Sequence, residues 1–207
     1  MKNTIAIAVV AGLAAAASAQ DFSISMVAPA SVATNSTYTV EVWGSVTGGS
    51  WVDGTSAMAG FGIDAIATGG ASLVTANGGS VLSDWASGFG TDGTVNGADL
   101  EGTSGGQLAN LFGILNPGID MSNPILLFTF DVTVGAAGGD VTYTPANPNI
   151  NGGLSYYPDS QDGASVIAPN DSGTTLTLVG ATTHVVPAPA SLALLGLGGL
   201  VARRRRH

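Results

Sequence analysis

Apolar and polar residues alternate along much of the chain between residues 20 and 186. In the clearest run, residues 125–134, five apolar residues fall on one face: Leu126, Phe128, Phe130, Val132 and Val134. Because successive side chains of a strand point to opposite sides of a sheet, this period of two predicts a half-buried strand. Similar alternation predicts strands around Phe22, Ile24 and Met26; Tyr38, Val40 and Val42; Phe61, Ile63 and Ala65; Val141 and Tyr143; Ala164 and Val166; and Leu176 and Leu178.

Turn-forming dipeptides separate these segments. Asp-Gly or Asn-Gly pairs begin at Asp53, Asn77, Asp92, Asn96, Asn151 and Asp162, and such pairs favour hairpin turns. One short helix is expected from the spacing of Leu108, Leu111, Phe112 and Leu115, closed by Asn116-Pro117-Gly118. The pattern therefore predicts an all-β fold, an antiparallel two-sheet β-sandwich of about seven to nine strands.

The order of these segments resembles that of cohesin and carbohydrate-binding-module sandwiches. The resemblance depends on Gly-Phe-Gly-Ile-Asp at residues 60–64, and on Leu-Phe-Thr-Phe-Asp-Val at 127–132 followed by Val-Thr-Tyr at 141–143. It implies a jelly-roll or cohesin-like sandwich over residues 20–183. Since sandwich folds host many functions, the resemblance implies no single activity.

Charge is distributed unevenly along the chain. The five basic residues are Lys2 and residues 203–206, whereas all 14 Asp and Glu residues lie between residues 20 and 186. A domain without Lys or Arg cannot neutralise phosphates, so nucleic-acid binding is excluded. The absence of cysteine removes disulfides, thiolate metal sites and cysteine nucleophiles. The domain between the terminal segments has one histidine, His184, and no cysteine, lysine or arginine for catalysis. We therefore expect a protein that is not an enzyme and has no cofactor.

The first 19 residues have the pattern of a secretory signal peptide. Lys2 gives a positive start, residues 4–16 are apolar, and Ala17-Ser18-Ala19 fits the small-x-small cleavage pattern. The expected partners are the secretion machinery and a signal peptidase that cuts between Ala17-Ser18-Ala19 and Gln20. The sequence thus predicts an exported chain that begins at Gln20.

The last segment, residues 184–207, predicts membrane anchoring. Pro187-Ala188-Pro189 precedes an apolar run, and Arg203, Arg204, Arg205 and Arg206 follow it. Prolines end the preceding structure. We expect a short transmembrane helix at residues 190–202, with the arginines as a cytoplasmic stop-transfer signal.

This tail resembles the PEP-CTERM sorting signal, which is also labelled an ice-binding protein C-terminal domain; Ala188 replaces the usual middle Glu. The resemblance implies an exosortase-like partner that cuts near the Pro-x-Pro element. It also implies that the domain is first anchored outside the cytoplasm, then placed on the cell surface or in the extracellular matrix.

Two clusters in the middle domain are candidate ligand sites. Asp92, Asn96 and Asp99 resemble the second half of a dockerin or EF-hand calcium loop, although Gly88 and Gly90 occupy positions where the first half needs oxygen side chains. Plain Asp-Gly and Asn-Gly turns are the alternative. Tyr156, Tyr157, Asp159 and Asp162 form the second cluster, in which tandem tyrosines could stack on sugar or help to bind calcium. The alternative is that the tyrosines pack under the loop.

The tryptophans Trp43, Trp51 and Trp85 are expected to be partly buried, and a sugar-binding platform is the alternative. The sequence favours a non-enzymatic surface or matrix protein. A carbohydrate-binding or calcium-dependent adhesion module stays open as the alternative.

Overall fold

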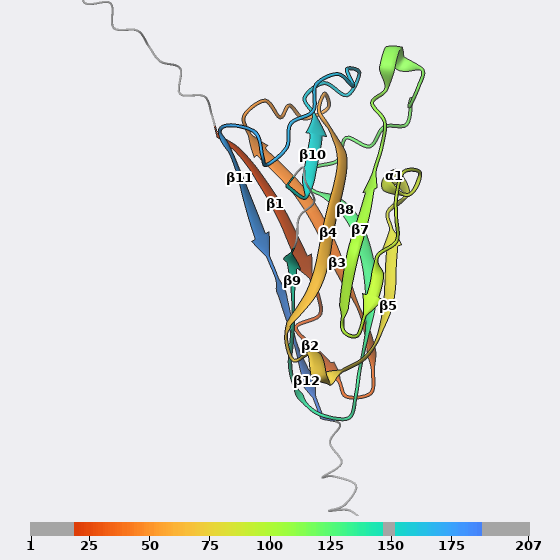
Figure 1. The fold of residues 1–207 in the computed structure, drawn as a ribbon, viewed down its shortest axis with the longest axis vertical. Coiled ribbons are helices and arrows are strands. Elements are labelled where there is room, and N and C mark those ends of the chain that lie inside the picture. The colour runs from red at the N-terminus through yellow and green to blue at the C-terminus, as the bar shows by residue number, and fades with distance from the viewer. Residues whose placement is uncertain (1–18, 147–151, 188–207) are drawn as a thin grey trace, which may run out of the picture.

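The computed structural model describes residues 19–146 and 152–187, which form two β-sheets packed face to face (Figure 1). The smaller sheet has the order β11 (Thr174–Val179), β1 (Gln20–Val27), β3 (Thr37–Gly48), β8 (Ile125–Val134) and β5 (Val74–Leu82). The larger has the order β2 (Ser31–Ala33), β12 (Ala181–Val186), β9 (Gly139–Ala146), β4 (Ala57–Gly69), β7 (Asp99–Gly106) and β6 (Thr94–Asn96), and β10 (Leu154–Tyr157) also pairs with β4. The predicted all-β sandwich is confirmed, but the described part of the chain has twelve strands, more than the seven to nine that were predicted.

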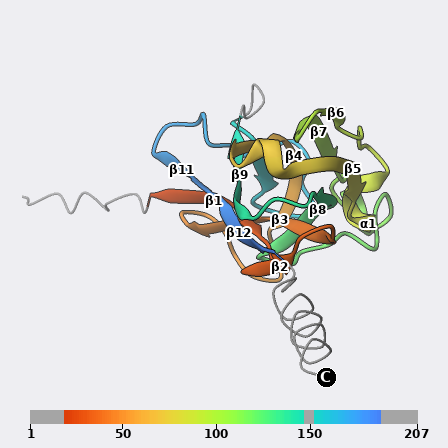
Figure 2. The same ribbon diagram turned by 90° about the horizontal axis from the view of Figure 1, so that it is seen from below.

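The inner faces of both sheets supply one core, which fills the space between the sheets seen in Figure 2. Aromatic residues cross it: the Phe61 and Phe128 rings lie 5.7 Å apart between centroids, and those of Phe130 and Tyr143 lie 5.1 Å apart. Each buried phenylalanine contributes about 1.5–3 kcal/mol through removal of its apolar surface from water. The alternation around Phe22, Phe61 and Tyr143 therefore predicted the core-facing sides of β1, β4 and β9 correctly.

Leu126 departs from the face predicted for it. Leu127 and Phe128 are both buried, whereas Leu126 is only partly buried. The cause is a β-bulge: Val42 of β3 lies opposite Phe128, but the next residue, Trp43, lies opposite Leu126 and skips Leu127. An extra residue in one strand redirects the side chains beyond it. The bulge brings Leu126 to the outer face of the smaller sheet, opposite Trp43.

Two strand pairs run parallel, which corrects the expectation of a wholly antiparallel sandwich. β1 pairs in parallel with β11, and β2 pairs in parallel with β12. Only Gly180 separates β11 from β12, yet the two strands belong to different sheets. A Cβ on Gly180 would lie 2.5 Å from the Tyr143 carbonyl oxygen, so this crossover requires glycine. The first strand, β1, and the last but one, β11, thus lie side by side at one edge of the smaller sheet (Figure 1).

The helix predicted at residues 108–115 is wrong. These residues belong to a loop with one 3₁₀ turn, η2 (Leu111–Gly113), in which Phe112 and Gly113 have φ values of 58° and 69°. Left-handed backbone at both positions cannot continue a right-handed helix. We call residues 108–119 the apolar loop, because its side chains include Phe112 at 91% and Ile114 at 79% exposure. The α-helix of the described residues is α1 (Asp84–Ser87), and a second 3₁₀ turn is η1 (Ala71–Leu73).

Two other local predictions also differ from the structure. Ala164 and Val166 form no strand; Val166 is exposed, and the neighbouring Ile167 makes only an isolated bridge with Tyr156. Asn77 and the glycine after it lie inside β5, where the pairing with β8 shifts register, and do not form a turn between strands. Both errors arise because long-range pairing partners decide strand formation in weakly patterned segments.

The ends of the domain differ slightly from the predicted boundaries. β1 begins at Gln20, and β12 continues to Val186, so His184 pairs with Asp140 of β9 inside the domain and does not belong to the C-terminal segment predicted from residue 184. Most of the predicted signal peptide and the predicted helix at residues 190–202 fall outside the described residues. Within residues 19–146 and 152–187, we find no helix whose length and apolarity would allow it to cross a bilayer.

Candidate functional site

A groove of about 500 Å³ lies on the outer side of the smaller sheet, where β3 and β8 meet the start of α1. We call it the tryptophan groove. It is lined by Trp43, Ser83, Asp84, Trp85, Asp120, Ser122, Pro124, Ile125, Leu126. Its volume falls in the range of small-molecule sites, and it combines aromatic surface with a few polar groups, as such sites do.

Trp43 reaches the groove because of its strand position. Its neighbours in β3, Val42 and Gly44, are buried, so Trp43 lies on the opposite, outer face. The indole Nε1 donates a hydrogen bond of 2.9 Å to the Glu41 carboxylate, which is on the same face of the strand. This bond fixes the ring and holds a third carboxylate near the groove.

Trp85 is anchored from the other side. Ser83, just before α1, donates its backbone N–H to the Leu127 carbonyl, and the Trp85 Nε1 donates to the Leu126 carbonyl at 2.7 Å. The Trp85 ring also contacts the core edge-on, with its centroid 6.0 Å from that of Phe61. Since both indole N–H groups already have acceptors, the tryptophans offer a ligand their ring surfaces.

The third wall is the segment that returns from the apolar loop. The Gln107 side chain clamps its start: Nε2 donates to the Asp120 carbonyl at 2.7 Å, and Oε1 accepts from the Asp120 N–H at 2.9 Å. Asn123 ties the segment to β3, donating to the Val46 carbonyl and accepting from the Val46 N–H. Asp120 and Ser122 are thereby held beside the tryptophans by two buried or half-buried amide side chains.

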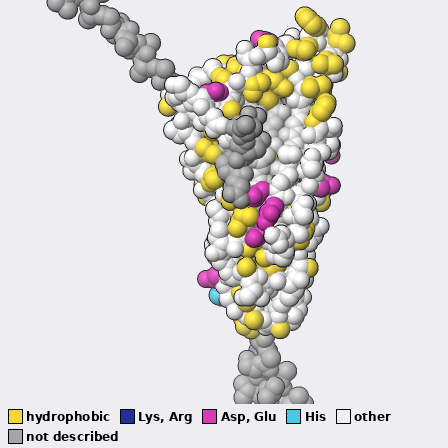
Figure 3. Space-filling view, in the orientation of Figure 1, with side chains coloured by type: hydrophobic (Ala, Val, Ile, Leu, Met, Phe, Trp, Pro, Cys, Tyr) yellow, Lys and Arg dark blue, Asp and Glu magenta, His cyan; other side chains and the backbone are white. Residues whose placement is uncertain are grey.

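The polar groups of the groove are mainly hydrogen-bond acceptors. No described residue donates a hydrogen bond to the Asp84 carboxylate, and Asp120 accepts through Oδ1 from the Ser122 N–H. The Ser83 hydroxyl is buried without a hydrogen-bond partner among the described residues. Figure 3 shows carboxylates scattered over one face of the domain and no Lys or Arg there. The groove can therefore accept hydrogen bonds and attract positive charge.

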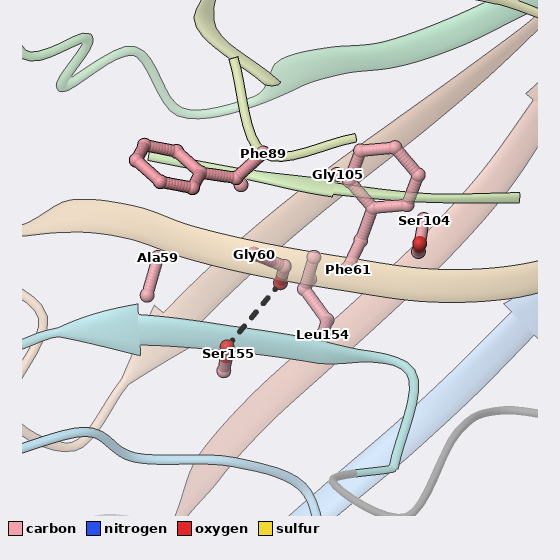
Figure 4. Close-up of a pocket in the computed structure, with 9 residues that line it drawn as sticks. Ala59, Gly60, Phe61, Phe89, Ser104, Gly105, Leu154 and Ser155 are labelled. Atoms are coloured by element: carbon pink, nitrogen blue, oxygen red, sulfur yellow. Dashed lines mark hydrogen bonds between the residues drawn. The ribbon is translucent and has the colours of Figure 1, made fainter. Parts of the chain in front are cut away.

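A second hollow, of about 190 Å³, lies where β4, β7 and β10 meet (Figure 4). Backbone from Ala59, Gly60 and Gly105 forms much of its lining, and Phe89 lies beside it. The Ser155 hydroxyl already donates to the Gly60 carbonyl, as the dashed line in Figure 4 marks. The hollow is smaller than typical ligand pockets and offers few free polar groups, so the tryptophan groove is the better candidate.

Ser104, in the same hollow, is the middle residue of a Gly-x-Ser-x-Gly pentapeptide, residues 102–106, whereas the expectation of no enzyme wrongly took this motif to be absent from the sequence. Serine hydrolases place this motif on a sharp turn between strand and helix, whereas here it lies within β7. His184, the histidine among the described residues, is on β12, three strands away in the sheet and hydrogen-bonded to Asp140. Three strand spacings amount to about 14 Å, so these residues form no Ser–His pair.

The residues of the predicted calcium loop lie along a β-hairpin. Asn96 ends β6 and is paired with Asp99 at the start of β7, and Gly97 between them has the positive φ of a tight turn. The Asp99 carboxylate accepts from the Ala67 N–H, and the Asn96 amide donates to Glu101. Asp92 lies before β6. Asn96-Gly97 forms the turn of this hairpin, and no three acidic or histidine side chains in the described ranges converge as metal ligands.

The tyrosine cluster is not the exposed platform that the sequence indicated. Tyr156 is fully buried, and its hydroxyl donates to Gln20 Oε1 at 2.6 Å, while its ring packs on Trp51. The Tyr157 hydroxyl donates to the Gln107 carbonyl. In the neighbouring loop, the Asp159 carboxylate accepts a hydrogen bond from the Gln161 N–H, and the Asp162 carboxylate accepts one from the Ala164 N–H. These four residues therefore stabilise the loop and do not gather around a ligand site.

Among the sorting residues, Ala19 and Pro187 are the first and last described, at the two ends of the domain. Ala17, Ala188, Pro189 and the four arginines lie outside the described residues. No model of a known protein family matches this chain, and no curated protein matches it either.

Proposed function

We propose that this chain is an exported surface protein whose β-sandwich binds carbohydrate through the tryptophan groove. The single observation that carries the binding proposal is the pairing of two fixed indole side chains, Trp43 and Trp85, with the carboxylates of Asp84 and Asp120 in one open groove. The export and anchoring part is carried by the signal-peptide pattern and the PEP-CTERM-like tail.

Sugar rings suit this combination of groups. One face of a pyranose presents C–H groups that pack on an aromatic ring, and its hydroxyls donate to acidic oxygens. The indoles are already oriented by hydrogen bonds and by contact with the core, so little side-chain freedom is lost on binding. We infer that the sandwich functions like the carbohydrate-binding modules that its segment order resembles.

The arrangement of the domain supports this proposal. β8 begins at the groove with Ile125 and ends nine residues later at Val134, which corresponds to roughly 30 Å. At that far end the Asn35 backbone N–H donates a hydrogen bond to the Gly135 carbonyl, and the Thr34 N–H donates to the carbonyl of Val186, near the end of the domain. A membrane anchor following residue 187 would therefore hold the domain with the groove directed away from the membrane.

The binding proposal is tested by a glycan array followed by calorimetry on the best ligands. Trp43→Ala should weaken binding at least about five-fold, since an aromatic contact contributes about 1 kcal/mol beyond buried area. Trp51→Ala is the matched control, because Trp51 packs on Tyr156 and does not line the groove. Binding unaffected by Trp43→Ala, or no glycan bound at all, would contradict the proposal.

The anchoring proposal has its own test. Removal of residues 187–207 should release the domain to the periplasm or the medium, and replacement of residues 203–206 by serine should impair retention. Cell fractionation and immunoblotting measure both. If both variants localise as the parent chain does, the tail is not an anchor, whatever the groove binds.

A further inference from the structure

The tryptophan groove is strongly one-sided in charge. Asp84 and Asp120 line it, and Glu41 is held beside it by the Trp43 indole N–H. Between residues 20 and 186 there is no Lys or Arg to offset these carboxylates. A groove of this kind repels anionic ligands and favours cations.

Many other carboxylates of the domain are already engaged, which sets the groove apart. Asp131 accepts from the Thr39 hydroxyl at 2.6 Å, and Asp99 and Asp171 accept from backbone N–H groups. In contrast, the Asp84 carboxylate accepts no hydrogen bond from the described residues, and Asp120 uses only Oδ1. Free carboxylate oxygens therefore coincide with aromatic surface at this place.

The buried Ser83 hydroxyl adds an unpartnered polar atom beside the groove, one of four such side-chain atoms among the described residues. It lines the groove and has no hydrogen-bond partner among the described residues. A buried polar atom without a partner is costly, and native proteins rarely retain one without a reason. A ligand hydroxyl or ammonium group in the groove would supply the missing partner after a small rotation of the side chain.

We propose that the groove selects carbohydrates with free amino groups, such as partly deacetylated amino-sugar polymers, over neutral and acidic ones. The inference rests on the proposed carbohydrate function and names its ligand class. A sugar ammonium group placed over an indole face is attracted by the ring quadrupole, and adjacent carboxylates neutralise its charge. The rest of the pyranose ring packs on the second tryptophan.

The test compares oligomers of glucosamine and of N-acetylglucosamine of equal length, titrated into the full chain by calorimetry. At mildly acidic pH the free amino groups are protonated while Asp and Glu stay ionised. The glucosamine oligomer should bind at least ten-fold more tightly than the N-acetylglucosamine oligomer. Added salt should reduce this difference in affinity, because it screens the attraction between the ammonium groups and the carboxylates. Polylysine serves as a cationic probe without sugar rings.

Three variants locate the effect. Asp84→Asn and Asp120→Asn should each reduce the preference for the glucosamine oligomer several-fold, because each weakens binding of the glucosamine oligomer more than binding of the acetylated oligomer. Asp140→Asn removes the same charge from β9, next to His184 and away from the groove, and should preserve the preference. An equal loss with Asp140→Asn would show that overall acidity, not the groove, selects the ligand, and would overturn the inference.

The remaining outcomes separate the two proposals. Equal affinity for both oligomers would overturn the amino-sugar inference and leave carbohydrate binding standing. Binding of polylysine alone would overturn the sugar class, and a peptide would then be the ligand. No binding of any probe would overturn the proposed function together with this inference.

Discussion

Gln107 links the stability of the fold to the shape of the groove. Its buried side chain makes three hydrogen bonds: Nε2 donates to the Met58 and Asp120 carbonyls at 2.8 and 2.7 Å, and Oε1 accepts from the Asp120 N–H at 2.9 Å. Gln107→Ala removes all three and leaves buried backbone groups without partners. At about 1 kcal/mol for each lost bond, the free energy of unfolding should fall by about 3 kcal/mol.

The same substitution should weaken ligand binding, because Asp120 would no longer be fixed beside the tryptophans. Urea unfolding followed by tryptophan fluorescence measures the stability, and calorimetry measures the affinity. Asn116→Ala is the matched control in the same loop, since its amide bonds only the Leu108 carbonyl in an exposed region; its effect should stay within about 0.5 kcal/mol. Gln107→Glu keeps the side-chain size but replaces the donor by oxygen facing two carbonyls, and should be as destabilising as alanine.

A cost below about 1 kcal/mol for Gln107→Ala would refute the clamp. So would full stability in Gln107→Glu, because the hydrogen-bond pattern would then be irrelevant and only side-chain volume would matter.

Three further predictions follow from the fold. Burial raises the pKa of Tyr143 above its ordinary value of 10.0. The neutral phenol therefore stabilises the fold fully below pH 10, and this stabilisation is lost as the pH rises from 10 toward the pKa of the folded state. The domain should unfold in alkali, and Tyr143→Phe should unfold at a higher pH in a titration followed by fluorescence. Gly180→Ala should cost about 1–3 kcal/mol by overpacking at the sheet crossover, whereas Gly118→Ala, with open space around it, should be neutral in urea unfolding. Phe112→Ser, at a position 91% exposed, should change the unfolding free energy by less than about 0.5 kcal/mol and raise the solubility limit; a large stability loss there would show that the apolar loop packs in solution.

The strands with strong alternation were predictable because each carries its own signal. The period of two predicts that Phe22, Phe128 and Val141 lie on the inner faces of their strands, and all three side chains are buried. β5 was missed because its sequence, Val-Thr-Ala-Asn-Gly-Gly-Ser-Val-Leu, lacks that period, and its pairing with β8 is interrupted by register shifts. A segment of this kind becomes a strand only because β8 supplies hydrogen-bond partners along it.

The residues of the candidate site could not be predicted from their neighbours in the sequence. The sequence indicated Tyr156, Tyr157, Asp159 and Asp162 because they are adjacent, but adjacent residues in a strand point to opposite faces, and Tyr156 entered the core. The tryptophan groove combines Trp43, Trp85 and Asp120, which are far apart in the chain. Nothing in the sequence marks Leu127 as the bulged residue that redirects Leu126.

By itself the sequence determined the all-β class, the faces of the regular strands, the acidity of the domain and the absence of cysteine chemistry, since composition and local periodicity express these directly. Only the tertiary structure decided the parallel pairing of β1 with β11, the loop at residues 108–119 and the assembly of the groove. Each of these depends on contacts between distant segments, such as β1 with β11 or Gln107 with Asp120. The free energy of such contacts is a property of two surfaces that meet in space, and no single stretch of residues carries it.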